Sequence, residues 1–125
     1  MRCLADTHAL LWYAQGNPSL SVAARRAMET GTCFFSVASL WEIAIKLKTG
    51  KLAAQFTISE FARFLEHAGL ICLGIESEHL DRIAELPDIH RDPFDRLLIA
   101  QALEENLTIV TTDGYIPQYP VQALW

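Results

Sequence analysis

Four carboxylates lie far apart along this chain, each where an expected strand ends or an expected helix begins: Asp6, Glu42, Asp95 and Asp113. In an open parallel α/β sheet, the carboxyl ends of the strands share one edge, and ligands bind in the crevice beside that edge. The four acids can therefore gather in one pocket. Ligand sets made only of oxygen favour a hard cation such as Mg²⁺ or Mn²⁺.

The first two acids also have ordinary alternative roles. Asp6 follows an apolar run and precedes a helical pattern, so its carboxylate suits a helix N-cap. Glu42 suits an exposed ion pair with Lys46 one turn further on, which stabilises a helix by only about 0.3 kcal/mol. Trp41 and Ile45 make the flank of this helix apolar. We therefore expect the helix to be covered on more than one side and Glu42 to face a crevice.

The other two acids share their segments with turn and capping residues. Asp92 suits an N-cap and Pro93 the first position of a helix, while an acid at Asp95 complements the helix macrodipole. We assign capping to Asp92 and chemistry to Asp95, because the first turn of a helix at the carboxyl edge can reach a metal. Asp113 follows a strand and precedes Gly114, which is equally typical of an ordinary turn.

Neighbouring polar side chains can support such a pocket. The hydroxyls of Thr111 and Thr112 can orient a carboxylate or a water molecule. Lys46 and Arg96 can offer positive charge at the crevice, with ordinary surface charge as the alternative, which is favoured for the neighbouring Arg91. We count Thr111, Thr112, Lys46 and Arg96 as supporting members of the predicted site.

The histidines and cysteines show no metal-ligand spacing. We expect the histidines to lie at the surface or beside the site, and His8 is the most interesting because it follows Asp6 by two residues. The cysteines lie inside apolar runs and are expected to be buried thiols that act as small hydrophobes. The residues concerned are His8, His67, His79, His90, Cys3, Cys33 and Cys72.

Short apolar runs alternate with segments of helical periodicity along the whole chain. Strands are expected at 2–5, 32–35, 70–73, 108–111 and 121–124, and helices at 7–15, 19–30, 37–48, 57–68, 77–86 and 93–105. This alternation indicates right-handed crossovers and a parallel sheet buried on both faces. The predicted fold is α/β with three layers, in which helices flank a central parallel sheet of about five strands.

Length, composition and charge limit the functional classes. With 125 residues and 51% hydrophobic content, the chain is expected to form a single domain over 1–125. We expect no membrane span, since no apolar run approaches about 18 residues, and no signal peptide, and hence a cytoplasmic protein. A net charge of −5 disfavours binding to nucleic acid, because contacts with phosphate groups normally use Lys and Arg. For such binding, a bound metal ion would have to make the local charge positive.

Four segments in register give the whole chain a resemblance to a known family. They are LADTHALLW, SVASLWEIAIKLKTGKL, HRDPFDRLLIAQAL and IVTTD. The chain resembles a PIN domain, in particular the VapC-type toxin ribonucleases of bacterial toxin–antitoxin pairs. The resemblance implies a PIN-like fold and places the acidic residues of the family on Asp6, Glu42 and Asp95, with a more variable fourth on Asp113 and its accompanying threonine on Thr111.

The same resemblance implies an activity and partners. The expected activity is metal-dependent hydrolysis of RNA with one or two Mg²⁺ or Mn²⁺ ions, which leaves 5′-phosphate and 3′-hydroxyl ends. The expected partners are RNA, with a tRNA or rRNA loop suited to the acidic protein, and a VapB-type antitoxin that presents Arg to the carboxylates. Trp41 and Trp125 suggest a homodimer surface, although burial in the core would explain each of them as well.

Two other functions remain open from the sequence. A catalytically silent PIN-like binding module would keep the fold and dock a partner, but the presence of all four acids disfavours it. A magnesium-dependent phosphotransfer protein is the less favoured alternative. Its first strand should end in a pair of acids, whereas this one is followed by Asp6, Thr7 and His8.

Overall fold

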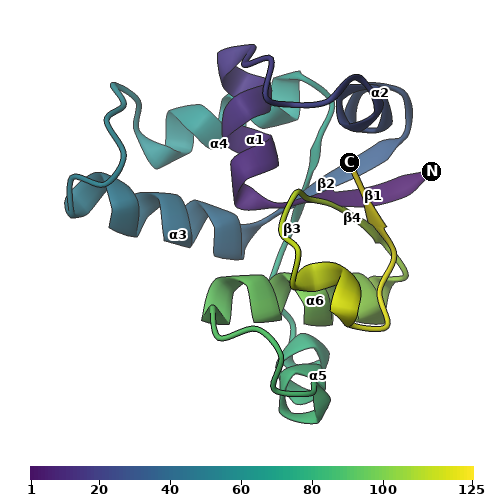
Figure 1. Ribbon diagram of the computed structural model, residues 1–125. Helices are drawn as coiled ribbons and strands as arrows, with labels where there is room; N and C mark the ends of the chain where they lie inside the picture. The colour runs from purple at the N-terminus through teal and green to yellow at the C-terminus, as the bar shows by residue number, and fades with distance from the viewer.

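A parallel sheet of five short strands forms the centre of the computed structural model, which describes residues 1–125 (Figure 1). The strands are β1 (Arg2–Ala5), β2 (Thr32–Ser36), β3 (Ile71–Leu73), β4 (Thr108–Val110) and β5 (Ala123–Leu124). Their order is β3-β2-β1-β4-β5, and every neighbouring pair is parallel. β1 is therefore central. The predicted α/β class with a parallel sheet of about five strands is confirmed.

All the expected helices are present: α1 (Thr7–Gln15), α2 (Val22–Thr30), α3 (Val37–Lys48), α4 (Ile58–His67), α5 (Ser77–Glu85) and α6 (Pro93–Glu105). A short 3-10 helix, η1 (Ile116–Gln118), was not expected. The expected helix 19–30 begins later, at Val22, because the side chain of Ser21 caps its first turn. The expected strand 121–124 is shortened to Ala123–Leu124.

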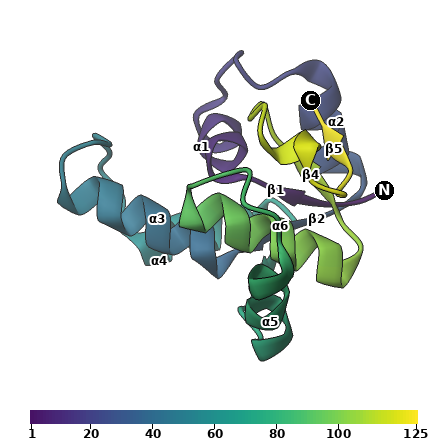
Figure 2. The same cartoon turned by 60° about the horizontal axis from the view of Figure 1, so that its bottom comes forward.

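Helices cover both faces of the sheet. α1, α2 and α4 lie on one face, and α6 lies on the other with α5 packed outside it (Figures 1 and 2). Alternate side chains of β1 point to the two faces, as the pleat requires. Cys3 and Ala5 belong to the buried cluster beneath α1, α2 and α4, whereas Leu4 belongs to the cluster beneath α6, and all three are fully buried. The sheet thus separates two apolar layers.

A buried chain of hydrogen bonds fixes α3 against α6. The Ser36 hydroxyl donates to Oε1 of Gln101 at 2.6 Å and accepts from the backbone N–H of Ala38 at 3.0 Å. Nε2 of Gln101 in turn donates to the carbonyl oxygen of Gly74 at 3.1 Å. Ser36 and Gln101 are both fully buried, so breaking this chain would leave unpaired polar groups in the core. The link holds the first turn of α3 at a set position relative to α6.

Three expectations about burial are wrong. Cys72 and Ile71 are exposed because β3 is an edge strand, whereas the sequence predicted burial on both faces. Trp41 and Ile45 are 59% and 41% exposed, so α3 is not covered on its apolar flank as expected. Cys3 and Cys33 are buried thiols as predicted. No helix has the length and apolar character that a membrane span needs.

Candidate active site

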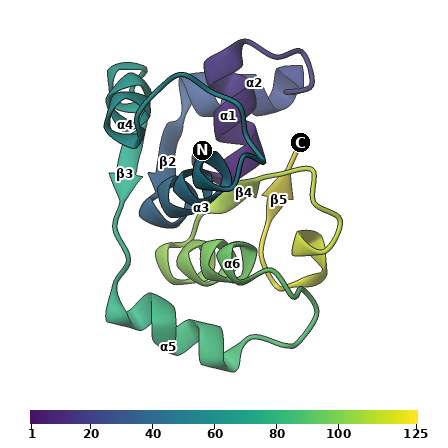
Figure 3. The same cartoon turned by 90° about the vertical axis from the view of Figure 1, so that its left-hand side faces the viewer.

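The N-terminal ends of α1, α3 and α6 and the segment after β4 meet at the carboxyl edge of the sheet (Figure 3). They surround a pocket of about 320 Å³ that is open to solvent and has no hydrophobic residue in its lining. The lining residues are Asp6, Thr7, His8, Glu42, Lys46, His90, Asp92, Asp95, Thr112 and Asp113. The structure therefore brings all four predicted acids to one place.

Asp6 is held between the end of β1 and the start of α1. Its backbone N–H donates to the carbonyl oxygen of Val110 at 3.1 Å, which continues the pairing of β1 with β4. Its Oδ1 accepts from the backbone N–H of Ala9 at 2.9 Å and caps α1. Asp6 is 5% exposed. Capping therefore orients the carboxylate and leaves Oδ2 free of helix hydrogen bonds.

Glu42 is buried on the side of α3 that faces α1, and both carboxylate oxygens have partners. Oε1 accepts from the hydroxyl of Thr7 at 2.7 Å, and this hydroxyl also lies 3.0 Å from that of Ser39. Oε2 lies 3.1 Å from Nζ of Lys46. The ion pair with Lys46 that the sequence allowed is present. It is not an exposed surface pair, because Glu42 is only 8% exposed and both residues line the pocket.

Asp95 and Asp113 meet around the imidazole of His90. Nε2 of His90 lies 3.0 Å from Oδ2 of Asp95 and 2.9 Å from Oδ2 of Asp113. These three side chains can offer ligand atoms that all lie within 4.8 Å of one another. Asp92 caps α6 through Oδ1, which accepts from the N–H groups of Phe94 and Asp95 at 2.8 and 3.1 Å. The capping role expected for Asp92 is confirmed.

Negative charge exceeds positive charge in the pocket. Five of its lining residues are carboxylates, and Lys46 is the one lysine or arginine among them. Burial raises the pKa of Asp95 to about 7, and neighbouring acids add to this effect. Burial also raises the pKa of Asp6, and hydrogen bonds from Thr111 and Ala9 offset only part of the rise. An oxygen-rich donor set with excess negative charge fits a hard divalent cation.

Asp113 behaves differently from the other acids of the pocket. Burial acts to raise its pKa, but hydrogen bonds from the Tyr115 N–H and from His90 outweigh burial, so the pKa lies below its ordinary value. The hydroxyl of Thr111 accepts from the backbone N–H of Asp113 at 2.9 Å, so Thr111 shapes this turn. Thr112 lines the pocket, as expected for a supporting residue.

Arg96 does not supply charge to the pocket, contrary to expectation. Its guanidinium donates to the carbonyl oxygen of Pro87 at 3.0 Å and to the hydroxyl of Tyr119 at 3.2 Å, and it is absent from the pocket lining. The residue lies in the first turn of α6, and its side chain turns toward the loop before the helix. Arg96 therefore holds that loop in place and does not face the carboxylates.

Sequence reasoning missed two pocket residues and one buried histidine. Thr7 binds Glu42 and directly follows Asp6, and this adjacency was the available signal. His90 stands two residues before Asp92, but its carboxylate partners lie further along the chain, so no ligand motif marks it. His79 is fully buried, although a position at the surface or beside the site was expected. His8 lines the pocket as an exposed residue.

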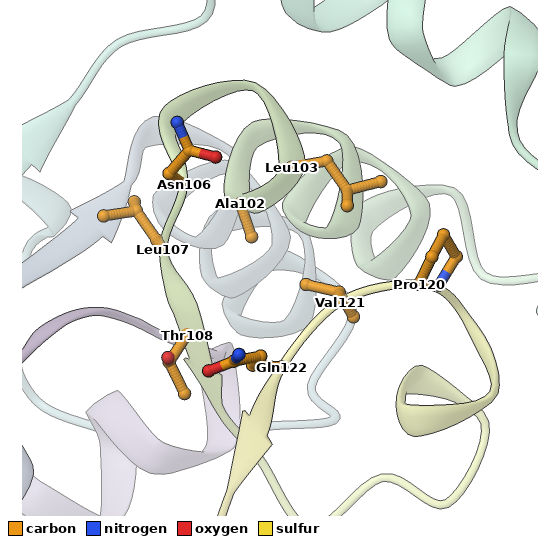
Figure 4. A pocket seen from close by; sticks show the side chains of 8 residues that line it. All are labelled: Ala102, Leu103, Asn106, Leu107, Thr108, Pro120, Val121 and Gln122. Atoms are coloured by element: carbon orange, nitrogen blue, oxygen red, sulfur yellow. The ribbon is translucent and has the colours of Figure 1, made fainter.

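A second hollow, of about 240 Å³, lies near the C-terminal end of α6 (Figure 4). Side chains from the α6–β4 turn and from the segment leading into β5 line it. None is a carboxylate, histidine, cysteine or basic residue, so this hollow lacks acid–base or metal-binding groups. The residues are Ala102, Leu103, Asn106, Leu107, Thr108, Pro120, Val121 and Gln122.

Comparison with known proteins gives a family match and several matches of fold. The family model of the PIN domain matches residues 3–121. A search of curated proteins gives no match. VapBC2 from Rickettsia felis, solved bound to a DNA fragment from its promoter, has a similar fold with a TM-score of 0.74 and 15% identity, over 99% of this chain and 98% of that chain.

Two further solved structures have the same fold. FitAcB from Neisseria gonorrhoeae is 18% identical over 100% of this chain and 97% of that chain, with a TM-score of 0.67. VapBC-1 from nontypeable Haemophilus influenzae is 15% identical over 99% of this chain and 97% of that chain, with a TM-score of 0.64. At this level of identity, the comparisons establish a shared fold.

Proposed function

The chain belongs to the PIN domain family, and from that premise we propose that it is a divalent-metal-dependent endoribonuclease, the toxin of a VapBC-type toxin–antitoxin pair. The observation that carries this proposal is the pocket itself, where five carboxylates converge around a single lysine. The likeness of the fold to that of VapBC and FitAB structures supports the toxin assignment. A cytoplasmic site of action is part of the same proposal.

In this proposal, Asp6, Glu42, Asp95 and Asp113 hold one or two Mg²⁺ or Mn²⁺ ions. A bound ion would activate a water molecule, neutralise the scissile phosphate and stabilise the leaving oxygen. The carboxylates are held before any ion binds, because Asp6 caps α1 and Glu42 is fixed by Thr7. Side chains that are already oriented lose little conformational freedom on binding, which favours both affinity and rate.

Lys46 would act on the RNA side of the pocket. The side chain of Lys46 is 28% exposed, so its ammonium group can reach a phosphate at the pocket mouth while it stays beside Glu42. Lys46 is the one lysine or arginine in the lining, and the net charge is −5, so contacts to the RNA backbone should be few. We therefore propose a short structured target, such as a tRNA or rRNA loop, that is cleaved at a small number of sites.

The proposed partners are an antitoxin and a second copy of the chain. An antitoxin segment that presents Arg to the carboxylates would replace the missing positive charge of the pocket. The exposure of Trp41 and Ile45 supports a homodimer, because it leaves an apolar flank of α3 open to solvent. Trp125 supports this less, since its ring packs against Trp12 with centroids 5.6 Å apart.

The experiment compares the wild-type protein with Asp6→Asn and with Asp81→Asn as a control. Asn also caps helices well, so Asp6→Asn should keep α1 while it removes a charged ligand. Asp81 is an exposed acid on α5, outside the pocket, where the same chemical change should be silent. Each protein is incubated with total RNA, with added metal or with a chelator, and the 5′ ends of the products are mapped.

We expect the wild type and Asp81→Asn to cut at the same few sites, with 5′-phosphate and 3′-hydroxyl products, and only when metal is present. Asp6→Asn should leave the RNA intact. Cleavage by Asp6→Asn or in chelator would contradict the proposed chemistry, as would 2′,3′-cyclic phosphate ends. Intact RNA with every protein would favour the silent binding module, and uniform degradation of all transcripts would contradict a short structured target.

A further inference from the structure

His90 links two carboxylates of the pocket to one turn of backbone. Its Nε2 lies between Oδ2 of Asp95 and Oδ2 of Asp113, at 3.0 and 2.9 Å. Its other ring nitrogen, Nδ1, accepts a hydrogen bond from the backbone N–H of Asp92 at 3.2 Å. Both ring nitrogens are therefore engaged by the protein. The separation of the ligand atoms alone would suit a metal site of two carboxylates and one imidazole just as well.

The hydrogen bond from the backbone N–H of Asp92 to Nδ1 distinguishes a histidine that donates to the carboxylates from a histidine that binds a metal ion. A backbone N–H can only donate, so Nδ1 must present its lone pair. In a neutral imidazole the proton then lies on Nε2, the atom that faces the two carboxylates. A ring nitrogen that carries a proton has no lone pair for a metal ion. His90 can bind a metal through Nε2 only if the proton moves to Nδ1, which would break the bond from Asp92.

We infer that His90 is a positioning residue of the pocket: its Nε2–H donates to Asp113 and lies against Asp95, it holds both carboxylates for metal binding, and His90 does not itself bind the metal. The inference rests on the metal site of the proposed function. Contacts to one ring nitrogen bring the two carboxylates together. The imidazole keeps them in one place before an ion arrives.

The protein holds the backbone of His90 firmly. The hydroxyl of Tyr119 accepts from the backbone N–H groups of His90 and Ile89, at 2.7 and 3.2 Å. Tyr119 is 3% exposed and also accepts from Arg96 at 3.2 Å. The His90 ring lies beside Tyr115, with ring centroids 5.0 Å apart. Arg96 points toward the Tyr119 hydroxyl and the carbonyl oxygen of Pro87, and these hydrogen bonds stabilise the loop that carries His90.

His79 has the same connections and provides an internal control. Its Nδ1 accepts from the backbone N–H of Glu76 at 2.9 Å, and its Nε2 lies 2.9 Å from Oε2 of Glu105. It is fully buried and does not line the pocket. The two histidines should therefore carry their proton on the same nitrogen, and His79, which lies outside the pocket, serves as the reference when metal is added.

The first experiment measures which ring nitrogen carries the proton, by ¹⁵N NMR of the histidines in the metal-free protein and after addition of Mg²⁺. We expect a protonated Nε2 and an unprotonated Nδ1 for His90 in both states, with His79 unchanged as the reference. Spin-echo EPR with Mn²⁺ should show no ¹⁴N coupling from a bound imidazole. A proton that moves to Nδ1 on Mg²⁺ addition, or a ¹⁴N coupling that disappears in His90→Phe, would overturn the inference.

The second experiment compares metal affinity in His90→Phe and His90→Gln. Phe keeps the ring but removes both nitrogens, whereas Gln places an N–H donor near the position of Nε2. We expect His90→Phe to weaken binding of Mg²⁺ and Mn²⁺ by a similar factor of about 10 to 100, and His90→Gln to recover most of the loss. A loss much larger for Mn²⁺ than for Mg²⁺ would indicate a nitrogen ligand and contradict a positioning role.

These measurements separate this inference from the proposed ribonuclease activity. The ¹⁵N assignment and the metal affinities need no RNA. If the wild type cut no RNA, the activity would be refuted, while a proton on Nε2 and a rescue by Gln would still support the positioning role. If Mg²⁺ and Mn²⁺ failed to bind the wild type, the metal site and the inference that rests on it would both be refuted. If His90→Phe unfolds, the ¹⁵N measurement on the wild type decides alone.

Discussion

The two ends of α6 carry acidic residues in opposite circumstances. At the C-terminal end, Glu104 lies 2.9 Å from Nη2 of Arg82 and Glu105 lies 2.9 Å from Nε2 of His79. Each acid there has its own partner. At the N-terminal end, Asp92 and Asp95 face three further carboxylates of the pocket, and these five acids share one lysine, Lys46, and the imidazole of His90.

The helix macrodipole makes this contrast informative. Acids near a C-terminus meet the negative end of the dipole, so individual partners offset an unfavourable position. Acids near an N-terminus are favoured by the dipole, but that favour does not balance five converging carboxylates. The paired acids at the C-terminal end therefore have a structural role, whereas the unbalanced carboxylates at the N-terminal end support the proposed metal site.

The largest difference should appear in RNA cleavage. We expect Asp95→Asn to reduce the cleavage rate about 1000-fold, which corresponds to about 4 kcal/mol of barrier, because a proposed metal ligand is lost. Glu105→Gln at the other end of α6 should change the rate by less than about twofold. Initial rates on one mapped RNA site measure both effects. Equal losses of cleavage rate in Asp95→Asn and Glu105→Gln would contradict a functional difference between the two ends of α6.

The next effect concerns stability at the paired end. His79→Phe leaves the backbone N–H of Glu76 without its acceptor and Glu105 without its partner, so the free energy of unfolding should fall by about 3 kcal/mol. Urea denaturation measures this change. Below the melting range, cleavage by the folded variant should match the wild type. A cleavage defect without a loss of stability would place His79 in the function of the distant pocket.

A third effect is the pH dependence of the free energy of unfolding, which involves Asp95 at the N-terminal end of α6. The pKa of Asp95 is raised to about 7, so between about pH 4 and pH 7 the folded state keeps a proton that the unfolded state releases. Without metal, stability should therefore fall as pH rises through this window. Asp95→Asn removes the effect and should be more stable than the wild type at pH 8 by about 2 kcal/mol, with the difference vanishing toward pH 4. Denaturation in chelator across this range tests it.

The smallest effect is expected at an exposed ion pair. The side chains of Arg82 and Glu104 are 37% and 30% exposed, so Arg82→Gln should lower the free energy of unfolding by only about 0.5 kcal/mol. High salt should reduce even this difference. Urea denaturation at low and high ionic strength provides the measurement. A loss several times larger would show that the paired end is more tightly coupled to the core than its exposure indicates.

Much of the fold followed from local signals in the sequence. Apolar runs and capping residues placed β1, α1, α3 and α6 at their observed bounds, because these signals act within a few residues. A capping box of Thr57 and Glu60 begins α4 and is another signal of this local kind. The meeting of Asp6, Glu42 and Asp113 also followed, since the carboxyl ends of parallel strands must share an edge.

Features that depend on distant partners were missed. Asp113 lies 23 residues after His90, and Glu105 lies 26 residues after His79, so neither of these two contacts leaves a local pattern. Exposure of Cys72 depends on β3 being an edge strand, which is a property of the strand order and not of the strand sequence. The guanidinium of Arg96 binds the carbonyl oxygen of Pro87 on the preceding loop, and this acceptor depends on how the loop folds back over α6.

The most direct test of the account counts divalent ions by EPR titration of Mn²⁺ into the wild type, Asp95→Asn and Glu105→Gln. The unbalanced carboxylates predict one or two bound ions in the wild type and in Glu105→Gln, and a loss of binding in Asp95→Asn. No bound ion in the wild type, or equal binding by Asp95→Asn and the wild type, would contradict the claim that this pocket is a metal site.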